Sequence, residues 1–122
     1  MTMPEPEINK LIQSLEALSK ELSPKVSLEQ AILYLLVCTK EDYPLTELGE
    51  RMDWNALKTS RQVNTLAAER YDGREYHQGY EVLYTQEDPE SRIFKNVFLT
   101  HKGKELKETI LGILREKSVK KG

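Results

Sequence analysis

The chain has 122 residues, which supports one domain with a modest hydrophobic core. Its formal net charge of -2 argues against a protein that coats nucleic acid indiscriminately, although locally clustered Lys and Arg still allow a specific contact with DNA. No apolar run approaches the roughly 20 residues of a membrane span, and the acidic, proline-bearing start is unlike a signal peptide. We therefore expect a cytoplasmic protein.

The first predicted element is an amphipathic helix over residues 7–22. Its apolar residues recur at the i, i+3, i+4 and i+7 spacing of one helix face. They are Ile8, Leu11, Ile12, Leu15, Leu18 and Leu22. Ser23-Pro24 should end this helix, because proline disfavours a helical conformation in the residue before it.

A second helix is predicted from the residue after Ser27 to about Thr39. Ser27 and Gln30 have the spacing of a capping box, in which each side chain bonds to the backbone of the other residue. The helix is apolar on most sides and is expected in the core. The single cysteine, Cys38, lies in this apolar run, so it forms no internal disulfide and is expected to be a buried structural thiol rather than a redox sensor.

Two further helices are predicted after Pro44. The first covers residues 45–52 with Thr46 as its N-cap, and the second runs from about 56 to 69. A short polar turn around Trp54 separates them. Two short helices joined in this way make a helix-turn-helix.

The next segment predicts a β-hairpin over residues 80–99. Residues 80–84 and 92–99 are rich in β-branched and aromatic residues and indicate antiparallel strands. Asp88-Pro89 opens a turn, predicted over 86–91, because proline restricts both its own φ and the residue before it. The preceding segment, 70–78, is expected to lengthen the fourth helix or to form a loop.

Thr100 can cap a last helix over residues 100–117, followed by a basic tail over 118–122. The whole chain, 1–122, is therefore predicted to be one α+β domain that is mostly helical. Within it, residues 27–99 have the element order of a winged helix-turn-helix, in which a two- or three-stranded hairpin forms the wing. The winged helix is flanked by the N-terminal and C-terminal helices.

The fourth predicted helix, about 56–69, is the candidate for DNA recognition. If Val63, Leu66 and Ala67 face the core, the outward side and its flanks carry two cations, several hydrogen-bonding groups and no acid before Glu69. The residues predicted to point outward are Lys58, Arg61, Thr65 and Ala68, and those on the flanks are Ser60, Gln62 and Asn64. Arg pairs with guanine edges and Asn or Gln with adenine edges in the major groove. The alternative is an ordinary solvated helix face.

The hairpin and the start of the third helix supply further candidate DNA contacts. Arg92 and Lys95 would reach the phosphate backbone or a minor groove, with Asp88 orienting Arg92. The alternative is that Asp88 and Arg92 only bridge the turn, which contributes little when exposed. Thr46 is also a candidate contact. The sequence has no phosphate loop, nucleophile–base motif or metal-ligand spacing, so we expect no enzyme activity, cofactor or metal.

These motifs resemble those of the MarR family of winged-helix transcriptional regulators. The family's wing pattern, D-P-x-[DS]-R-R and then V-x-L-T-x-x-G-x-x-L, is similar to Asp88, Pro89, Ser91, Arg92, Val97, Leu99, Thr100, Gly103 and Leu106. Its recognition-helix pattern, S-R-x-V-x-x-L, resembles Ser60, Arg61, Val63 and Leu66. The preceding family pattern L-x-x-L-A-x-x-L resembles Leu45, Leu48, Gly49 and Met52. Ile93 stands where the family has a second arginine, and Arg70 where it usually has a glycine.

The resemblance implies a homodimeric transcriptional regulator that dimerises through its first and last helices and binds a palindromic operator. The recognition helix would enter the major groove, and the wing, about 86–95, would contact the backbone or minor groove. A small-molecule effector is possible by family analogy alone. Two other functions stay open. One is a winged-helix protein-interaction module that has lost specific DNA binding, which Ile93, Arg70 with the tyrosine-containing segment 70–78, and the acidic net charge favour. The other is a sequence-tolerant architectural DNA binder.

Overall fold

The computed structural model describes residues 5–23, 25–40, 42–67, 69–72, 75–78, 80–88 and 91–116, and gives the backbone alone for 69–72, 75–78, 88 and 91–94. The elements in chain order are α1 (Pro6–Glu21), α2 (Leu28–Thr39), β1 (Tyr43–Pro44), α3 (Leu45–Met52), α4 (Ala56–Leu66), β2 (Glu69–Asp72), β3 (Glu75–Gln78), β4 (Leu83–Asp88), β5 (Ser91–Leu99) and α5 (His101–Arg115). None of the described helices is long and apolar enough to cross a membrane.

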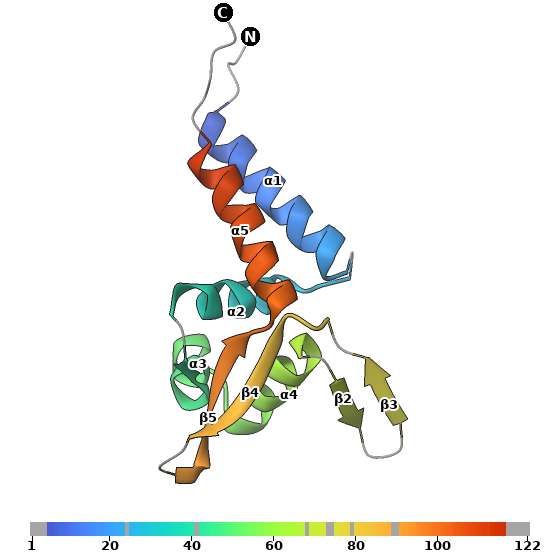
Figure 1. Ribbon diagram of the computed structural model, residues 1–122, viewed down its shortest axis with the longest axis vertical. Helices are drawn as coiled ribbons and strands as arrows, with labels where there is room; N and C mark the ends of the chain where they lie inside the picture. Colours follow the sequence, from blue (N-terminus) through green and yellow to red (C-terminus); the bar gives the residue numbers. More distant parts are fainter. Residues whose placement is uncertain are drawn as a thin grey trace, which may run out of the picture.

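Helices α1 and α5 lie side by side and extend away from the rest of the molecule (Figure 1). The Nζ of Lys10 near the start of α1 donates a hydrogen bond of 3.3 Å to the carbonyl oxygen of Leu114 near the end of α5. The apolar stripe of α1 is divided along its length. Leu18 and Leu22 are buried in the core, whereas the four earlier members of the stripe are exposed. Those four are Ile8, Leu11, Ile12 and Leu15.

Helix α2 lies between this helical pair and the helix-turn-helix (Figure 1). The predicted capping box is confirmed: Ser27 Oγ accepts from the backbone N–H of Gln30, and Gln30 Oε1 accepts from the backbone N–H of Ser27. The helix is central to the core, as predicted. Its buried residues are Ala31, Leu33, Tyr34 and Val37.

Helices α3 and α4 form the predicted helix-turn-helix, with two corrections. Thr46 is not the N-cap of α3, because the helix already begins at Leu45 after Pro44, and no side chain caps it. Helix α4 ends at Leu66, earlier than the predicted Glu69. The carbonyl oxygens at the end of α4 accept hydrogen bonds from residues 80–82 instead of from a further helical turn. The N–H groups of Tyr80, Val82 and Glu81 donate to the carbonyl oxygens of Thr65, Leu66 and Ala67, respectively.

The wing is an antiparallel sheet in the order β1-β5-β4. The strand predicted over 80–84 was placed too early, because residues 80–82 bond to the end of α4 and Glu81 has a positive φ of 63°. Strand β4 instead begins at Leu83 and continues to Asp88, through residues predicted to form the turn. The two-residue strand β1 pairs Tyr43 with Val97 and had no clear signal in the sequence. Residues 89 and 90, at the predicted turn, lie outside the described part of the chain.

The segment over 70–78 neither lengthens α4 nor forms a loop. Strands β2 and β3 pair antiparallel from Glu69↔Gln78 to Asp72↔Glu75 and form a two-stranded sheet of their own. Figure 1 shows this hairpin standing apart from the wing. The chain therefore carries an additional hairpin between the recognition-helix candidate and the wing.

The last helix begins where it was predicted. Thr100 Oγ1 accepts from the N–H of Gly103 and donates to the carbonyl oxygen of Glu81, so one side chain caps α5 and fixes it to the segment before β4. A Cβ atom on Gly103 would overlap the carbonyl oxygen of Val82, so the close approach requires glycine here. The helix ends at Arg115, two residues before the predicted end, and the predicted tail over 118–122 lies outside the described residues.

Candidate nucleic-acid interface

The start of α4 is fixed by short hydrogen bonds in the turn before it. Asn55 caps the helix, since its Oδ1 accepts from the N–H of Lys58 at 2.8 Å. Thr59, which is buried, donates from its Oγ1 to the carbonyl oxygen of Asn55, also at 2.8 Å. These bonds fix where α4 begins and hold its first turn in place.

The outward face of α4 differs from the predicted one. Thr59, Val63 and Leu66 are buried, so the opposite side of the helix is centred on Leu57, Arg61 and Asn64, which follow one another at i, i+4 and i+7. All three side chains are exposed. Arg61 was predicted on this face and Asn64 on its flank, whereas Leu57, with 62% of its surface exposed, was missed. Its position one helical turn before Arg61 was a signal available in the sequence.

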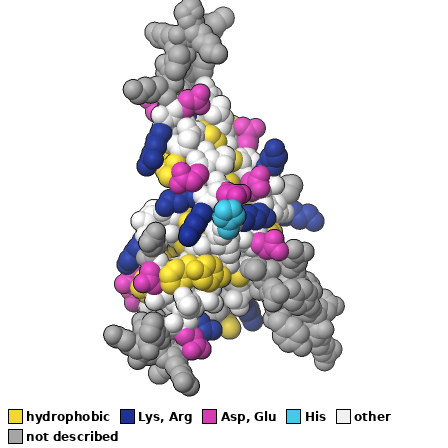
Figure 2. Space-filling model, in the orientation of Figure 1, with side chains coloured by type: hydrophobic (Ala, Val, Ile, Leu, Met, Phe, Trp, Pro, Cys, Tyr) yellow, Lys and Arg dark blue, Asp and Glu magenta, His cyan; other side chains and the backbone are white. Residues whose placement is uncertain are grey.

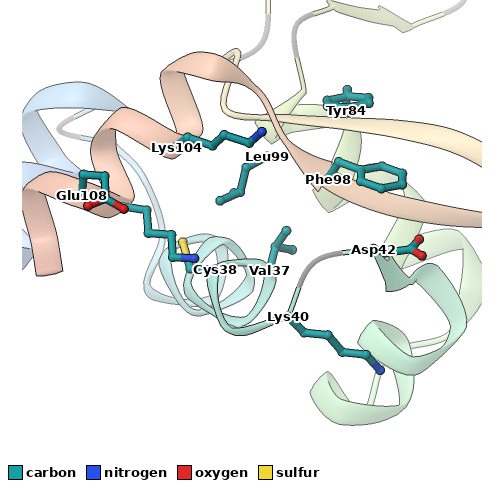
Figure 3. A pocket seen from close by; sticks show the side chains of 10 residues that line it. Val37, Cys38, Lys40, Asp42, Tyr84, Phe98, Leu99, Lys104 and Glu108 are labelled. Atoms are coloured by element: carbon teal, nitrogen blue, oxygen red, sulfur yellow. The ribbon is translucent and has the colours of Figure 1, made fainter.

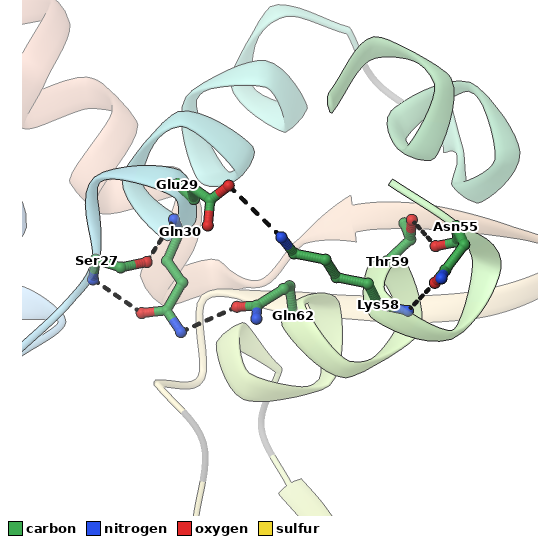
Figure 4. Close-up of polar contacts among 7 residues, drawn as sticks. All are labelled: Ser27, Glu29, Gln30, Asn55, Lys58, Thr59 and Gln62. Carbon is green, nitrogen blue, oxygen red and sulfur yellow. Dashed lines mark hydrogen bonds and ion pairs between the residues drawn. The ribbon is translucent and has the colours of Figure 1, made fainter. Parts of the chain in front are cut away.

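Three predicted contacts lie on the flanks of this face. Ser60, Gln62 and Thr65 are half-buried. The hydroxyl of Thr65 donates to the carbonyl oxygen of Arg61 at 3.0 Å. The side-chain amide of Gln30 in α2 donates to Gln62 Oε1 at 3.1 Å (Figure 4). Gln62 thus contributes to the α2–α4 contact, which reduces its freedom to reach a base.

Lys58 is held on the same side as Gln62. Its Nζ lies 3.7 Å from Glu29 Oε2 in α2 (Figure 4) and 4.9 Å from the centroid of the Trp54 ring. Both charged side chains are about half exposed, so the ion pair is screened by water and contributes little to stability. The pair leaves Arg61 as the cation at the centre of the outward face in the described part of α4.

Thr46 is exposed near the start of α3, beside the groove between α3 and α4. The two helices approach closely there at Gly49. A Cβ atom at this position would lie 2.7 Å from the hydroxyl oxygen of Thr59 and 3.3 Å from the carbonyl oxygen of Trp54. Glycine is accordingly required for the close packing that sets how α4 is presented.

The wing residues are placed by the register of β4 and β5. Lys95 is exposed and stands opposite Glu87. Asp88 and Arg92 lie on these two strands near the predicted turn, with an irregularity in the register between Glu87 and Asp88. Their side chains lie outside the described residues, so the proposed orientation of Arg92 by Asp88 stays a prediction.

A separate pocket lies between α2, the wing sheet and α5 (Figure 3). Tyr84 and Phe98 stack on its sheet side, with ring centroids 5.1 Å apart. Cys38 lines the pocket and is half-buried. Burial raises the pKa of its thiol, while the Tyr34 hydroxyl and the Lys107 ammonium lower it less. The thiol therefore stays protonated near neutral pH. The prediction that Cys38 is buried was wrong, since it is half-buried at the edge of this pocket.

Among the described residues, no group of three or more His, Cys, Asp or Glu side chains could hold a metal ion. On the face of the molecule shown in Figure 2, Lys and Arg side chains are interspersed with Asp and Glu. Among the described residues on this face, the basic side chains do not form a continuous surface that would coat DNA without regard to sequence.

No protein-family model matches the chain, and no curated protein is similar to it in sequence. Several solved structures share its fold. A complex of S. aureus MepR with DNA has a TM-score of 0.63 at 16% identity, over 87% of this chain and 77% of MepR. A structure of MarR has a TM-score of 0.59 at 17% identity, over 87% and 70% of the two chains. A MarR transcriptional regulator from Methanosarcina mazei Go1 has a TM-score of 0.60 at 18% identity, over 87% and 69%. These similarities concern the fold.

Proposed function

We propose that this chain, which has the MarR-like winged-helix fold, is a cytoplasmic, homodimeric, DNA-binding transcriptional regulator. The observation that carries the proposal is the outward face of α4. The second helix of a helix-turn-helix presents exposed Arg61 and Asn64 to solvent while Val63 and Leu66 anchor it in the core. Arg and Asn are the side chains that read guanine and adenine edges in the major groove. The MepR structure, whose fold is similar, is a complex with DNA.

In the proposed complex α4 lies in the major groove. Arg61 donates to a guanine and Asn64 bonds to an adenine, while Thr46 and the flanking residues of α4 position the helix on the backbone. The wing approaches the backbone or the adjacent minor groove through Lys95 and Arg92. Because the phosphate contacts release counterions, the affinity falls as salt concentration rises.

The exposed stripe of α1 supports the homodimer. Ile8, Leu11, Ile12 and Leu15 expose between 41% and 55% of their surface on one helix, and Leu114 of the neighbouring α5 is also exposed. Figure 2 shows hydrophobic side chains between the charged ones over this helical pair. Several large apolar side chains exposed along one helix face in this way are typically covered by a partner. A two-fold axis near α1 and α5 would present two copies of α4 to a palindromic operator.

The test is a fluorescence-anisotropy titration on a pool of random duplexes at two salt concentrations, followed by sequencing of the bound DNA. We expect salt-sensitive binding and an enriched palindrome. Arg61→Ala should weaken binding to the enriched duplex by about tenfold or more and alter base preference. Arg115→Ala removes the same charge from the distant end of α5 and serves as the matched control.

The other functions predict different outcomes of the same experiment. Salt-sensitive binding without any enriched sequence would identify an architectural DNA binder. Failure to bind any duplex at low salt, where phosphate contacts are strongest, would refute the DNA-binding function and favour a protein-interaction module.

A further inference from the structure

Leu57 is the apolar member of the outward face of α4. It lies between the directions of Arg61 and Asn64 around the helix axis and exposes 62% of its surface. A single exposed leucine is ordinary on a protein surface. This one differs in its position, because it occupies the centre of the face that the proposed function places in the major groove.

The direction of Leu57 is set by its neighbours. Asn55 caps the helix through Lys58, and the buried Thr59 bonds back to the carbonyl oxygen of Asn55. Lys58 turns toward Glu29 of α2, on the flank of the helix. Leu57 follows directly after the first residue of α4, where these bonds hold the backbone, so the direction of its Cα–Cβ bond is set.

The spacing of the three residues matches a short run of base pairs. With a rise of about 1.5 Å per residue, Leu57 and Arg61 are separated by about 6 Å along the helix, and Leu57 and Asn64 by about 10 Å. Base pairs are about 3.4 Å apart. For a helix that lies along the groove, the distance from Leu57 to Arg61 therefore corresponds to roughly two base-pair steps, and the distance from Leu57 to Asn64 to roughly three.

The major groove offers one apolar group that a leucine can contact, the 5-methyl group of thymine. Resting on the proposed function, we propose that Leu57 is a specificity-determining residue that packs against the 5-methyl group of a thymine. The thymine lies about two base-pair steps from the guanine contacted by Arg61. Each half-site of the operator thus holds a required thymine next to the polar contacts.

Deoxyuridine tests this contact directly, because it lacks the 5-methyl group and retains every hydrogen-bonding group of thymidine. In the duplex enriched by the wild-type protein, each thymine is replaced in turn by deoxyuridine and the dissociation constant is measured by anisotropy. Three proteins are compared: wild type, Leu57→Ala, and Leu28→Ala as a control. Leu28 lies in α2 and exposes 70% of its surface, so its removal matches the change in apolar area at a different site.

We expect one replacement in each half-site to weaken wild-type binding about threefold to fivefold, the effect of losing one buried methyl group. The same replacement should leave Leu57→Ala binding unchanged, whereas Leu28→Ala should respond like the wild type. The inference is wrong if no replacement weakens wild-type binding although Arg61→Ala does. It is equally wrong if the sensitive thymine remains sensitive in Leu57→Ala. If the wild type enriches no duplex, the proposed function fails first and this inference fails with it.

Discussion

The hydroxyl of Tyr34 in α2 donates a hydrogen bond of 2.6 Å to the carbonyl oxygen of Gly103 in α5. Tyr34 is fully buried, and burial raises the pKa of its phenol, so the group stays protonated and continues to donate. The bond joins the helical pair to the winged helix at the point where α5 leaves the wing.

Tyr34→Phe should therefore lower the free energy of unfolding by about 1 kcal/mol, because it removes one buried hydrogen bond and leaves the packing nearly unchanged. Urea denaturation measures the change. Tyr84→Phe is the matched control, since Tyr84 is exposed and no described residue bonds to its hydroxyl. Equal stabilities for wild type and Tyr34→Phe would show that the bond contributes nothing net.

Replacing each of the two glycines of α5 by alanine should change the stability of the protein in opposite directions. Gly103→Ala places a Cβ atom against the backbone of Val82 and should destabilise the fold by about 3 kcal/mol or prevent folding. Gly112→Ala meets no atom within 4 Å and should stabilise the helix by about 0.5–1 kcal/mol, the difference in helix propensity. Thermal unfolding followed by circular dichroism compares them. A tolerated Gly103→Ala would contradict the close approach of α5 to the segment before β4.

Leu11→Lys should dissociate the proposed homodimer. The substitution places a charge at the middle of the exposed stripe of α1, which the proposed interface would have to desolvate. Sedimentation equilibrium should show a dimer dissociation constant raised at least about tenfold, with unchanged helicity. Leu28→Lys, at an exposed leucine of α2, should leave the dimer intact. An unaffected dimer in Leu11→Lys would place the interface elsewhere.

The raised pKa of Cys38 predicts how stability depends on pH. Above the ordinary thiol pKa of about 8.5, the unfolded chain releases the Cys38 proton while the folded chain still binds it. In this range the unfolded state binds fewer protons than the folded state. The contribution of the Cys38 thiol to the free energy of unfolding therefore falls as the pH rises from the ordinary thiol pKa to the raised pKa of the folded chain. Urea titrations from pH 7 upward should show a smaller decline in Cys38→Ser than in the wild type. An identical pH dependence would refute the raised pKa.

Salt titrations should distinguish the residues that contact bases from those that contact the DNA backbone. Lys95→Ala should weaken binding to all duplexes alike and reduce the slope of log K against log salt by about 1, if its ammonium neutralises one phosphate. Arg61→Ala should instead reduce discrimination between the enriched duplex and a scrambled one. The measurement is the anisotropy affinity of both variants at several salt concentrations. A larger loss of discrimination in Lys95→Ala than in Arg61→Ala would reverse the two roles.

The predictions that succeeded concern groups close together in the chain. The Ser27–Gln30 capping box and the Thr100 cap each join residues within one helical turn, so the pattern alone predicts them. The order of elements, and with it the winged-helix fold class, could be predicted for the same reason. Hydrophobic periodicity and turn residues mark each element locally.

The errors concern interactions between distant segments. The end of α4 and the start of β4 were misplaced together, because residues 80–82 take the hydrogen bonds that would have prolonged the helix. The β2–β3 hairpin was also not predicted, although Asp72-Gly73 is a dipeptide that favours a hairpin turn. The secondary-structure propensity of a segment does not show which distant residues will compete for its backbone hydrogen bonds.

The sequence by itself determined the helix-turn-helix, the wing and the chemistry of the candidate DNA contacts, because residue type and local spacing are sufficient for these. Only the tertiary structure decided which of those contacts are presented. Thr59, Val63 and Leu66 are buried against the rest of the fold, which sets the rotation of α4 about its axis. Leu57, Arg61 and Asn64 consequently face outward. The direction of a surface side chain depends on what its helix packs against, and that information is spread over the whole fold.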